Sequence, residues 1–253
     1  MRIALISDIH ANLPALEAVL SHAGSIGVKR FWCLGDYVQF NAFPQEVVRT
    51  IRKLKTICIH GNIDSQVLEM KQQLKQTPLE GLDKDVFPFG WTYQQLSKKS
   101  RKFLKGLPDT IKIKAKGYRF LLVHGSPAAN DDPIYIDTPD ERLEELARMT
   151  KAHFILFGHT HKPFLREAHG VQFINPGSVG RPIDNDPRAS YAVLNIKRSS
   201  VGVEFFRVEF NVGIAVQAIR DAGLPEQYAR LVEAGIAAAD LPKQELIENE
   251  KDA

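Results

Sequence analysis

Short apolar runs alternate with helical patterns along the first sixty residues of the chain. Residues 2–6, 30–34 and 56–59 are brief runs rich in branched and aromatic side chains, and a polar turn follows each of them. They are predicted strands. Between them, apolar residues recur at helical spacing within residues 12–24 and 44–54. This strand, loop, helix, strand order predicts a parallel sheet in an α/β fold.

Two helix starts are marked by local signals. Asn12 followed by Pro14 is typical of a helix N-terminus, with the amide as the cap and the proline in the first turn. Thr138 and Glu141 have the spacing of a capping box, which predicts that Thr138 caps the next helix.

The pattern changes between residues 65 and 105. Helical segments there flank a centre interrupted by proline and glycine, and a basic amphipathic segment follows. Lys98, Lys99, Arg101 and Lys102 form its charged face. We interpret this face as a solvated helix surface in preference to a nucleic-acid contact.

The second half of the chain predicts mainly strands and ends in helices. Apolar or alternating runs occur near residues 111–115, 118–123, 154–157, 171–174, 190–196 and 201–208. Helical patterns begin near Val212, and a charged tail that we expect to be disordered follows them. We therefore predict a main domain over residues 1–210 and a helical extension over residues 211–253.

Composition limits the class of protein without identifying it. The chain has 253 residues, of which 44% are hydrophobic and 25% charged, and its formal net charge is +3. These values are ordinary for a globular protein, and the charge is too small to favour a nucleic-acid surface. The two cysteines and the absence of a CxxC motif argue against a disulfide scaffold or a thiolate zinc site. No run approaches a membrane span, so we expect a cytoplasmic protein.

Metal-competent side chains follow five of the predicted strands. Because the carboxyl ends of parallel strands meet at one edge of a sheet, we expect these side chains to lie close together. Carboxylate, amide and imidazole ligands without thiolate suit Mn²⁺, Fe, Zn²⁺ or Ni²⁺. Seven ligands are too many for one tetrahedral site and suit two divalent ions that share a carboxylate. The seven are Asp8, His10, Asp36, Asn62, His124, His159 and His161.

Signatures of other enzyme classes do not occur in the sequence. It contains neither a phosphate-binding loop for nucleoside triphosphates nor the His-Glu-x-x-His motif of zinc proteases. Gly177 and Ser178 lie in a run that is one residue short of a serine-hydrolase elbow.

The order and content of the metal-competent motifs resemble those of calcineurin-like metallophosphoesterases. The motifs are Asp8-Ile-His10, Gly35-Asp36, Gly61-Asn62, His124-Gly125 and Gly158-His159-Thr-His161. Residues 7–17 and the Asn-Pro-Gly-Ser-Val-Gly run at residues 175–180 are similar to the small bacterial and archaeal phosphodiesterase-like branch. The resemblance implies a four-layer αββα sandwich of two mixed β-sheets, with the metals at the joined loop edge.

The resemblance also implies a role for each site residue. Asp8, His10 and His161 are expected to hold the first ion. Asn62, His124 and His159 are expected to hold the second, and Asp36 is expected to bridge the two. The implied reaction is attack on phosphorus by a hydroxide formed from the water between the ions, with Mn²⁺ as the preferred metal.

The catalytic set implied in this way is Asp36, Asn62, Asp64 and His124. For substrate contacts we expect Asn12, Asn62 and Arg181, with Phe40 and Asn41 as further candidates. The expected substrate is a small phosphoester or a nucleotide.

One position departs from the family pattern. Many members carry a histidine after the Gly-Asn pair that protonates the leaving group, whereas this chain has Ile63, followed by the usual Asp64. Isoleucine cannot donate a proton. Either His60 or a water molecule replaces the missing acid, or the substrate has a better leaving group.

The sequence leaves several functions open. The first expectation is hydrolysis of a phosphodiester or an activated phosphomonoester. Phosphomonoester or phosphoprotein hydrolysis and dinucleoside polyphosphate hydrolysis would use the same site. A non-catalytic metal-binding scaffold of the same fold, as in the related retromer subunit, is the alternative from another class. The oligomeric state stays open.

Overall fold

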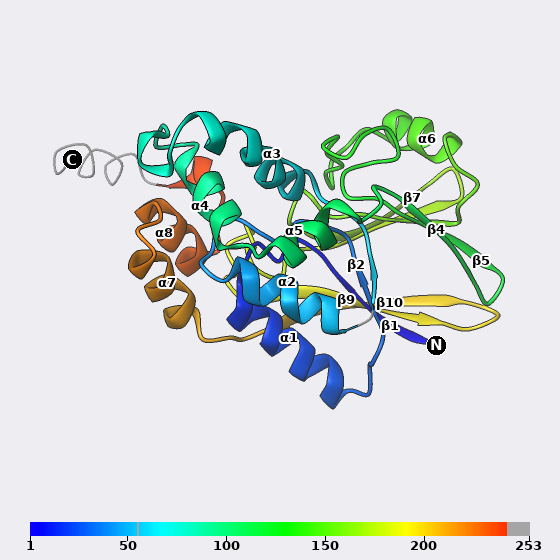
Figure 1. Cartoon of the computed structure of the whole chain (residues 1–253). Helices are drawn as coiled ribbons and strands as arrows, with labels where there is room; N and C mark the ends of the chain where they lie inside the picture. The colour runs from blue at the N-terminus through cyan, green and yellow to red at the C-terminus, as the bar shows by residue number, and fades with distance from the viewer. Residues whose placement is uncertain (55, 242–253) are drawn as a thin grey trace.

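Two five-stranded sheets lie face to face at the centre of the computed structural model, which describes residues 1–54 and 56–241 (Figure 1). The first sheet has the order β10-β9-β1-β2-β3. Its first three strands in the chain are parallel, and β9 and β10 are antiparallel to their neighbours, so the sheet is mixed. The strands are β1 (Arg2–Ile6), β2 (Phe31–Cys33), β3 (Ile57–Cys58), β9 (Ala189–Ile196) and β10 (Val201–Val208).

The second sheet has the order β4-β5-β6-β8-β7. Its central strands β5, β6 and β8 are parallel, and the outer strands β4 and β7 pair antiparallel with them. The strands are β4 (Ile111–Ala115), β5 (Tyr118–Leu122), β6 (Phe154–Leu156), β7 (Pro163–Ala168) and β8 (Val171–Pro176).

Alternating side chains divide the core into layers. In β1, Ile3 and Leu5 point toward the second sheet, while Ala4 and Ile6 belong to the core under the helices. Strand β6 does the same from the other side, because Phe154 packs between the sheets. This period of two makes each sheet apolar on both faces.

Helices cover the two outer faces. Helices α1 (Leu13–Ser25) and α2 (Pro44–Lys53) pack on the first sheet, and α6 (Asp140–Arg148) packs on the second. The layers therefore run helix, sheet, sheet, helix, and the predicted four-layer αββα sandwich is confirmed (Figure 1).

Two helical additions flank the sandwich. The first, between β3 and β4, contains α3 (Asn62–Gln76), the short η1 (Leu79–Gly81), α4 (Phe87–Gln95) and α5 (Lys98–Lys105).

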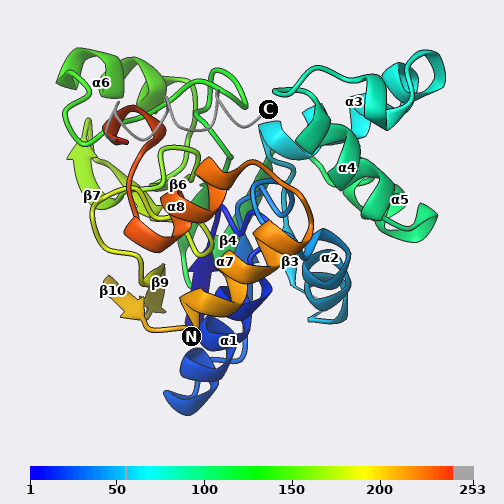
Figure 2. The same ribbon diagram turned by 90° about the vertical axis from the view of Figure 1, so that its left-hand side faces the viewer.

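The second addition lies near the C-terminus. Helices α7 (Val212–Asp221) and α8 (Glu226–Ala234) lie beside each other (Figure 2), and η2 (Ala238–Asp240) follows them. Helices begin at Val212 as expected. The charged tail lies outside the described residues, and the domain boundary at residue 210 stays a prediction.

The structure corrects two local predictions. Helix α6 begins at Asp140 with Pro139 as its N-cap, and the Thr138 hydroxyl accepts a hydrogen bond from the Tyr135 N–H, so the predicted capping box does not form. Strand β7 is a strand that the sequence does not predict.

The predicted cap of α1 is confirmed, because the Asn12 side chain accepts a hydrogen bond from the Ala15 N–H. Within the described residues, no helix is both long and apolar enough to cross a membrane.

Candidate metal centre

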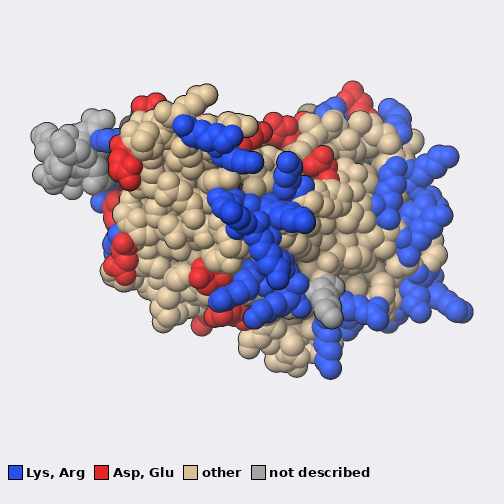
Figure 3. All heavy atoms as spheres, viewed as in Figure 1, with Lys and Arg blue, Asp and Glu red and all other residues tan. Residues whose placement is uncertain are grey.

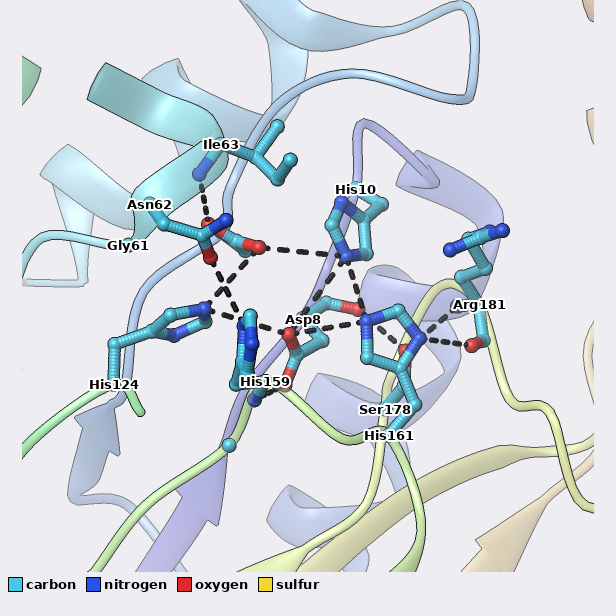
Figure 4. Close-up of polar contacts among 12 residues, drawn as sticks. Asp8, His10, Gly61, Asn62, Ile63, His124, His159, His161, Ser178 and Arg181 are labelled. Carbon is cyan, nitrogen blue, oxygen red and sulfur yellow. Dashed lines mark hydrogen bonds and ion pairs between the residues drawn. The ribbon is translucent and has the colours of Figure 1, made fainter. Parts of the chain in front are cut away.

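All seven predicted ligands lie at one edge of the two sheets, in the loops that follow β1, β2, β5 and β6 and at the start of α3, which follows β3. Figure 4 labels all of them except Asp36. Their side chains form a single cluster of oxygen and nitrogen atoms. Two overlapping groups within it are compact enough to hold an ion, with ligand atoms within 4.8 Å of one another. Both groups contain Asp8, one with His10 and His161 and the other with Asp36 and His124.

Asp8, His10 and His161, the first of these groups, form one end of the cluster, and this end is the more buried one. The Nε2 atoms of His10 and His161 lie 3.1 Å apart. Asp8 Oδ1 lies 3.3 Å from the His161 Nε2 and 3.7 Å from the His10 Nε2. These are the residues expected to hold the first ion.

Asp36 stands between this group and the rest of the cluster. Its Oδ2 lies 3.2 Å from His124 Nε2 and 3.8 Å from His10 Nε2. Its Oδ1 accepts a hydrogen bond of 2.9 Å from the Ile63 N–H. One carboxylate oxygen is therefore held by the first turn of α3, while the other faces both ends of the cluster.

The second end of the cluster contains Asn62, His124 and His159. The Asn62 Oδ1 lies 3.1 Å from the His159 Nδ1, and the rings of His124 and His159 meet edge to face at 5.4 Å. Asn62 and His159 are half-buried, whereas His124 is fully buried.

Backbone carbonyls fix the protonation of three imidazoles. The Nδ1 atoms of His10, His124 and His161 lie 3.2, 2.6 and 2.7 Å from the carbonyl oxygens of residues 38, 34 and 181. An imidazole that donates from Nδ1 presents its Nε2 to a metal ion, which binds there in place of a proton. The three Nε2 atoms all point into the cluster (Figure 4).

The loops that carry the ligands have unusual backbone conformations. Five of the seven ligand residues have positive φ angles: Asp8, His10, Asp36, His159 and His161, at 53°, 48°, 53°, 66° and 57°. This left-handed region costs a non-glycine residue about 1–2 kcal/mol. Such strain persists only where the surrounding structure over-determines it, and it concentrates at functional sites.

The electrostatics of the cluster favour a positive charge. Burial raises the pKa of Asp8, but His161, His10 and His124 outweigh it and hold that pKa well below its usual value. Burial lowers the pKa of His124, but Asp36 and Asp8 raise it to about 10. Two buried carboxylates therefore draw a cation toward the atoms between them.

Two buried ligand atoms, Asp8 Oδ1 and His124 Nε2, make no hydrogen bond within the described part of the chain. Their nearest charged neighbours are other ligands, because His124 Nε2 lies 3.2 Å from Asp36 Oδ2 and Asp8 Oδ1 lies 3.3 Å from His161 Nε2. Unpaired buried polar atoms are costly, and their presence here together with mixed oxygen and nitrogen donors fits divalent metal ions. The residues present therefore suit the metals that the sequence predicts.

A loop after β8 holds the Asp8 loop in place. The Ser178 hydroxyl donates to the Asp8 carbonyl oxygen at 2.7 Å and accepts from the Arg181 N–H at 2.8 Å. The Asn175 amide donates to the Gly158 carbonyl oxygen at 2.7 Å and thereby holds the turn that bears His159 and His161. Neither Ser178 nor Asn175 was predicted to act at the site, although both lie in the run that carries the family resemblance.

Glycine is required where these loops meet. A Cβ atom on Gly61 would lie 2.0 Å from Asp36 Oδ1, and one on Gly158 would lie 1.9 Å from the Ser7 hydroxyl oxygen. The glycines beside the ligands therefore allow the loops to approach closely.

The Asp64 carboxylate faces the backbone of the Asp36 loop, and its expected catalytic role stays a prediction. Its carboxylate accepts hydrogen bonds from the N–H groups of Asp36, Tyr37 and Gly61 at 2.9–3.1 Å. Burial and then the charge of Asp36 raise its pKa to about 8. Because its oxygens are taken up by the backbone, Asp64 positions the Asp36 loop.

Asn12 also differs from its prediction as a substrate contact. It is fully buried, and its side chain caps α1 and donates to the Gly180 carbonyl oxygen at 3.0 Å. The structure thus gives Asn12 a structural role.

Arg181 lies beside the buried end of the cluster. Its guanidinium carbon lies 4.2 Å from the centre of the Phe40 ring, which meets the His10 ring edge to face at 5.0 Å. The ring of Tyr228 in α8 also meets the Phe40 ring edge to face, at 5.2 Å. No hydrogen bond or ion pair of the guanidinium occurs within residues 1–54 and 56–241, so its donors can bind an anion.

Ile63 stands where the family's acid is expected, and His60 is the side chain that could replace it. Ile63 is half-buried and packs against the core beneath the helices, next to Asn62 (Figure 4). His60 lies outside the cluster: its Nδ1 lies 3.1 Å from the Ser65 hydroxyl oxygen, and its ring lines a cavity between α3 and α5.

Comparison with known proteins agrees with this geometry. Residues 1–199 match the calcineurin-like phosphoesterase superfamily domain. An uncharacterized protein of Methanocaldococcus jannaschii is 33% identical over 241 residues, which cover 88% of this chain and 94% of that protein. The phosphodiesterase YfcE of Escherichia coli is 28% identical over 205 residues, covering 77% and 88% respectively. The crystal structure of a metallophosphoesterase from Sphaerobacter thermophilus is 32% identical, covers 93% of this chain and 99% of that one, and superposes with a TM-score of 0.80.

Proposed function

This chain belongs to the calcineurin-like phosphoesterase superfamily, and from that premise we propose that it is a phosphoric ester hydrolase that works with two divalent metal ions. The observation that carries the proposal is a cluster in which five carboxylate and imidazole residues form two compact groups, Asn62 and His159 adjoin His124, and Asp36 Oδ2 faces both ends. Asp8, His10 and His161 would hold one ion, Asn62, His124 and His159 the other, and Asp36 both.

The donor set suits Mn²⁺ best, with Fe, Zn²⁺ and Ni²⁺ as alternatives. Ions of this kind supply Lewis acidity toward a phosphoryl oxygen and lower the pKa of a bound water. The amide at Asn62 contributes an oxygen without a third negative charge, so the centre keeps a net positive charge that attracts phosphate.

The chain's own groups bind and orient the ester at the open end of the cluster. Helix α3 begins at Asn62, and the N-terminus of a helix favours phosphate oxygens. Arg181 offers unpaired guanidinium donors beside His10, and its position over Phe40 restricts its movement. The half-buried side chains of Asn62 and His159 mark the side from which the substrate approaches.

The side chains near Asn62 determine which leaving groups the site can accept. Ile63 cannot protonate a departing oxygen, and His60 lies in a different cavity with its Nδ1 paired to Ser65. Substrates whose leaving group departs without such a proton are therefore favoured, which means phosphodiesters with aryl or nucleotide groups and activated monoesters.

A substrate and metal panel tests the proposal. Bis(p-nitrophenyl) phosphate, p-nitrophenyl phosphate and glycerol 2-phosphate are incubated with the full chain and Mn²⁺, Ni²⁺ or Mg²⁺. We expect metal-dependent turnover in which both aryl esters exceed glycerol 2-phosphate. Metal binding without turnover of any ester would indicate the scaffold function instead, and faster turnover of glycerol 2-phosphate would contradict the leaving-group argument.

A further inference from the structure

A second cavity lies between α3 and α5, away from the metal centre. Its volume is about 680 Å³, which is within the range of small-molecule sites. None of the seven proposed metal ligands lines it. Half-buried Leu68 and Tyr93 and buried His60 are among the residues that line it.

Positive charge gathers along one wall of this cavity. Four cations of α5 line the cavity: Lys98, Arg101, Lys102 and Lys105. The last three follow Lys98 by three, four and seven positions, so all four share one helical face. Lys and Arg side chains form a band across the middle of this side of the molecule (Figure 3). The sequence predicts only a solvated face here and not a cavity beneath it.

The charges on this wall are not neutralised by the chain. Within the described residues, no ion pair joins these four cations to a carboxylate, and Glu69 is the one acidic residue that lines the cavity. Like charges four residues apart on a helix repel each other, so the stripe destabilises α5 until an anion binds.

His60 supplies an independent polar feature. Its side chain is only 8% exposed, and its Nε2 is buried without a hydrogen-bond partner in the described part of the chain. Its Nδ1 is paired with the Ser65 hydroxyl at 3.1 Å, and both residues line the cavity. Because Nε2 has almost no accessible surface, His60 contributes to the cavity through the rest of its ring and its pair with Ser65.

Two planar groups lie next to each other in the cavity wall. The Arg101 guanidinium carbon lies 4.3 Å from the centre of the Tyr93 ring, so a planar cation and an aromatic ring stack within the cavity wall. Such stacks accept a further planar ring.

We propose that this cavity is a second ligand site that binds a nucleotide-class anion, an aromatic ring bearing phosphates. The aromatic ring lies against Leu68 and Tyr93, and the phosphates lie along the side formed by Lys98, Lys102 and Lys105. The proposal does not depend on the phosphoesterase activity, because it uses none of the metal ligands.

Calorimetric titration with ATP tests the site. The full chain carrying Asp36→Asn is used so that hydrolysis at the metal centre does not consume ATP, and the wild-type chain after metal removal is titrated in parallel. We expect one ATP per chain with the same affinity in both. Hydrolysis of ATP by the Asp36→Asn chain would count against the proposed metal centre and not against this cavity.

Matched variants of α5 locate the binding. Lys102→Glu and Lys98→Glu each reverse a charge that lines the cavity and are expected to weaken ATP binding by about tenfold. Lys99→Glu makes the same change on the same helix but lines a different cavity, with Arg49 and Arg52, and is expected to change the affinity less than about twofold. Melting curves confirm that each variant folds.

Three results would overturn the proposal. The first is the absence of ATP binding at millimolar concentration. The second is pyrophosphate binding as tightly as ATP, because the ring would then contribute nothing. The third is an equal loss in Lys99→Glu, together with tighter binding of a single-stranded oligonucleotide, which would show an extended polyanion surface in place of a site.

Discussion

The two ends of the metal centre differ in burial and in how they are held. At the Asp8 end, the side chains of Asp8, His10 and His161 are 0%, 1% and 5% exposed. Left-handed backbone fixes all three residues, and hydrogen bonds to carbonyl oxygens fix the two imidazoles. At the Asn62 end, His124 is fully buried and also bonded to a carbonyl oxygen, whereas Asn62 and His159 are half-buried and contact each other. We expect the buried end to keep an ion and the half-buried side chains to let a substrate reach one.

The backbone and charges of the metal centre also affect the stability of the fold. Positive φ angles and buried carboxylates cost free energy in the chain alone, and a bound cation offsets part of that cost. Metal binding should therefore stabilise the fold as well as enable catalysis, because a ligand that binds only the folded state at 100 times its Kd contributes about 2.7 kcal/mol.

The largest expected effect comes from the residue that joins the two ends. Asp36→Asn keeps the shape of the side chain and its Oδ1 contact with the Ile63 N–H but weakens the charge that faces both ends. We expect phosphodiesterase activity to fall by more than about 100-fold, since even losses around metal ligands cost 10–100-fold. The rise in melting temperature with Mn²⁺ should also disappear.

Asp221→Asn on exposed α7 makes the same chemical change away from the site and should leave both measurements unaltered. Near wild-type turnover of Asp36→Asn with added Mn²⁺ would show that Asp36 does not bridge.

The sequence predicts the ligands better than their supports for a physical reason. Strand ends and glycines are local signals, and parallel strands bring their ends together, so the positions of Asp36 and His124 follow from order along the chain. Asn175 and Ser178 act across 15–170 positions in the sequence, on atoms that no local pattern specifies. Asp64 has the type of a catalytic residue but turns toward the backbone.

Local predictions failed where two signals competed. Strand β7 begins at a proline and lies at a sheet edge, and proline weakens a strand pattern although edges tolerate it. At α6, Pro139 takes the cap position that Thr138 was predicted to hold.

His159 and His161 follow Gly158 and lie at different ends of the metal centre, so substitutions at these two residues compare the ends directly. Asparagine keeps an N–H near the place of Nδ1 but lacks Nε2. His161→Asn removes a buried ligand atom 3.3 Å from Asp8 Oδ1, and His159→Asn alters the half-buried end. We expect Mn²⁺ affinity, measured by calorimetry, to fall about tenfold further in His161→Asn than in His159→Asn, a difference of about 1.4 kcal/mol. Equal losses would remove the distinction between the ends.

Removal of the Ser178 hydroxyl tests how the buried end is supported. Ser178→Ala removes the hydrogen bonds to the Asp8 carbonyl and from the Arg181 N–H. Mn²⁺ affinity should fall about tenfold, as for other residues that orient metal ligands. Ser100→Ala is the control, because Ser100 is equally buried and its hydroxyl accepts a hydrogen bond of 3.1 Å from the Ser97 hydroxyl, on α5 and outside the metal centre. An equal fall in affinity in both variants would show that Ser178 acts only through the fold.

The smallest effect is expected at the open end, and it is a gain. Ile63→His places a proton donor beside Asn62, where the leaving group of a bound ester is expected to lie. General acids contribute about 10²–10⁴-fold when well placed, and an imidazole introduced without supporting contacts should give about tenfold or less. That gain should appear in kcat for glycerol 2-phosphate and not for bis(p-nitrophenyl) phosphate, because only the alkoxide needs the proton. Ile63→Gln has similar polarity without an acid and should leave the ratio of the two kcat values unchanged. A ratio that shifts equally in both variants would mean that side-chain polarity, and not proton donation, sets the substrate preference at this end.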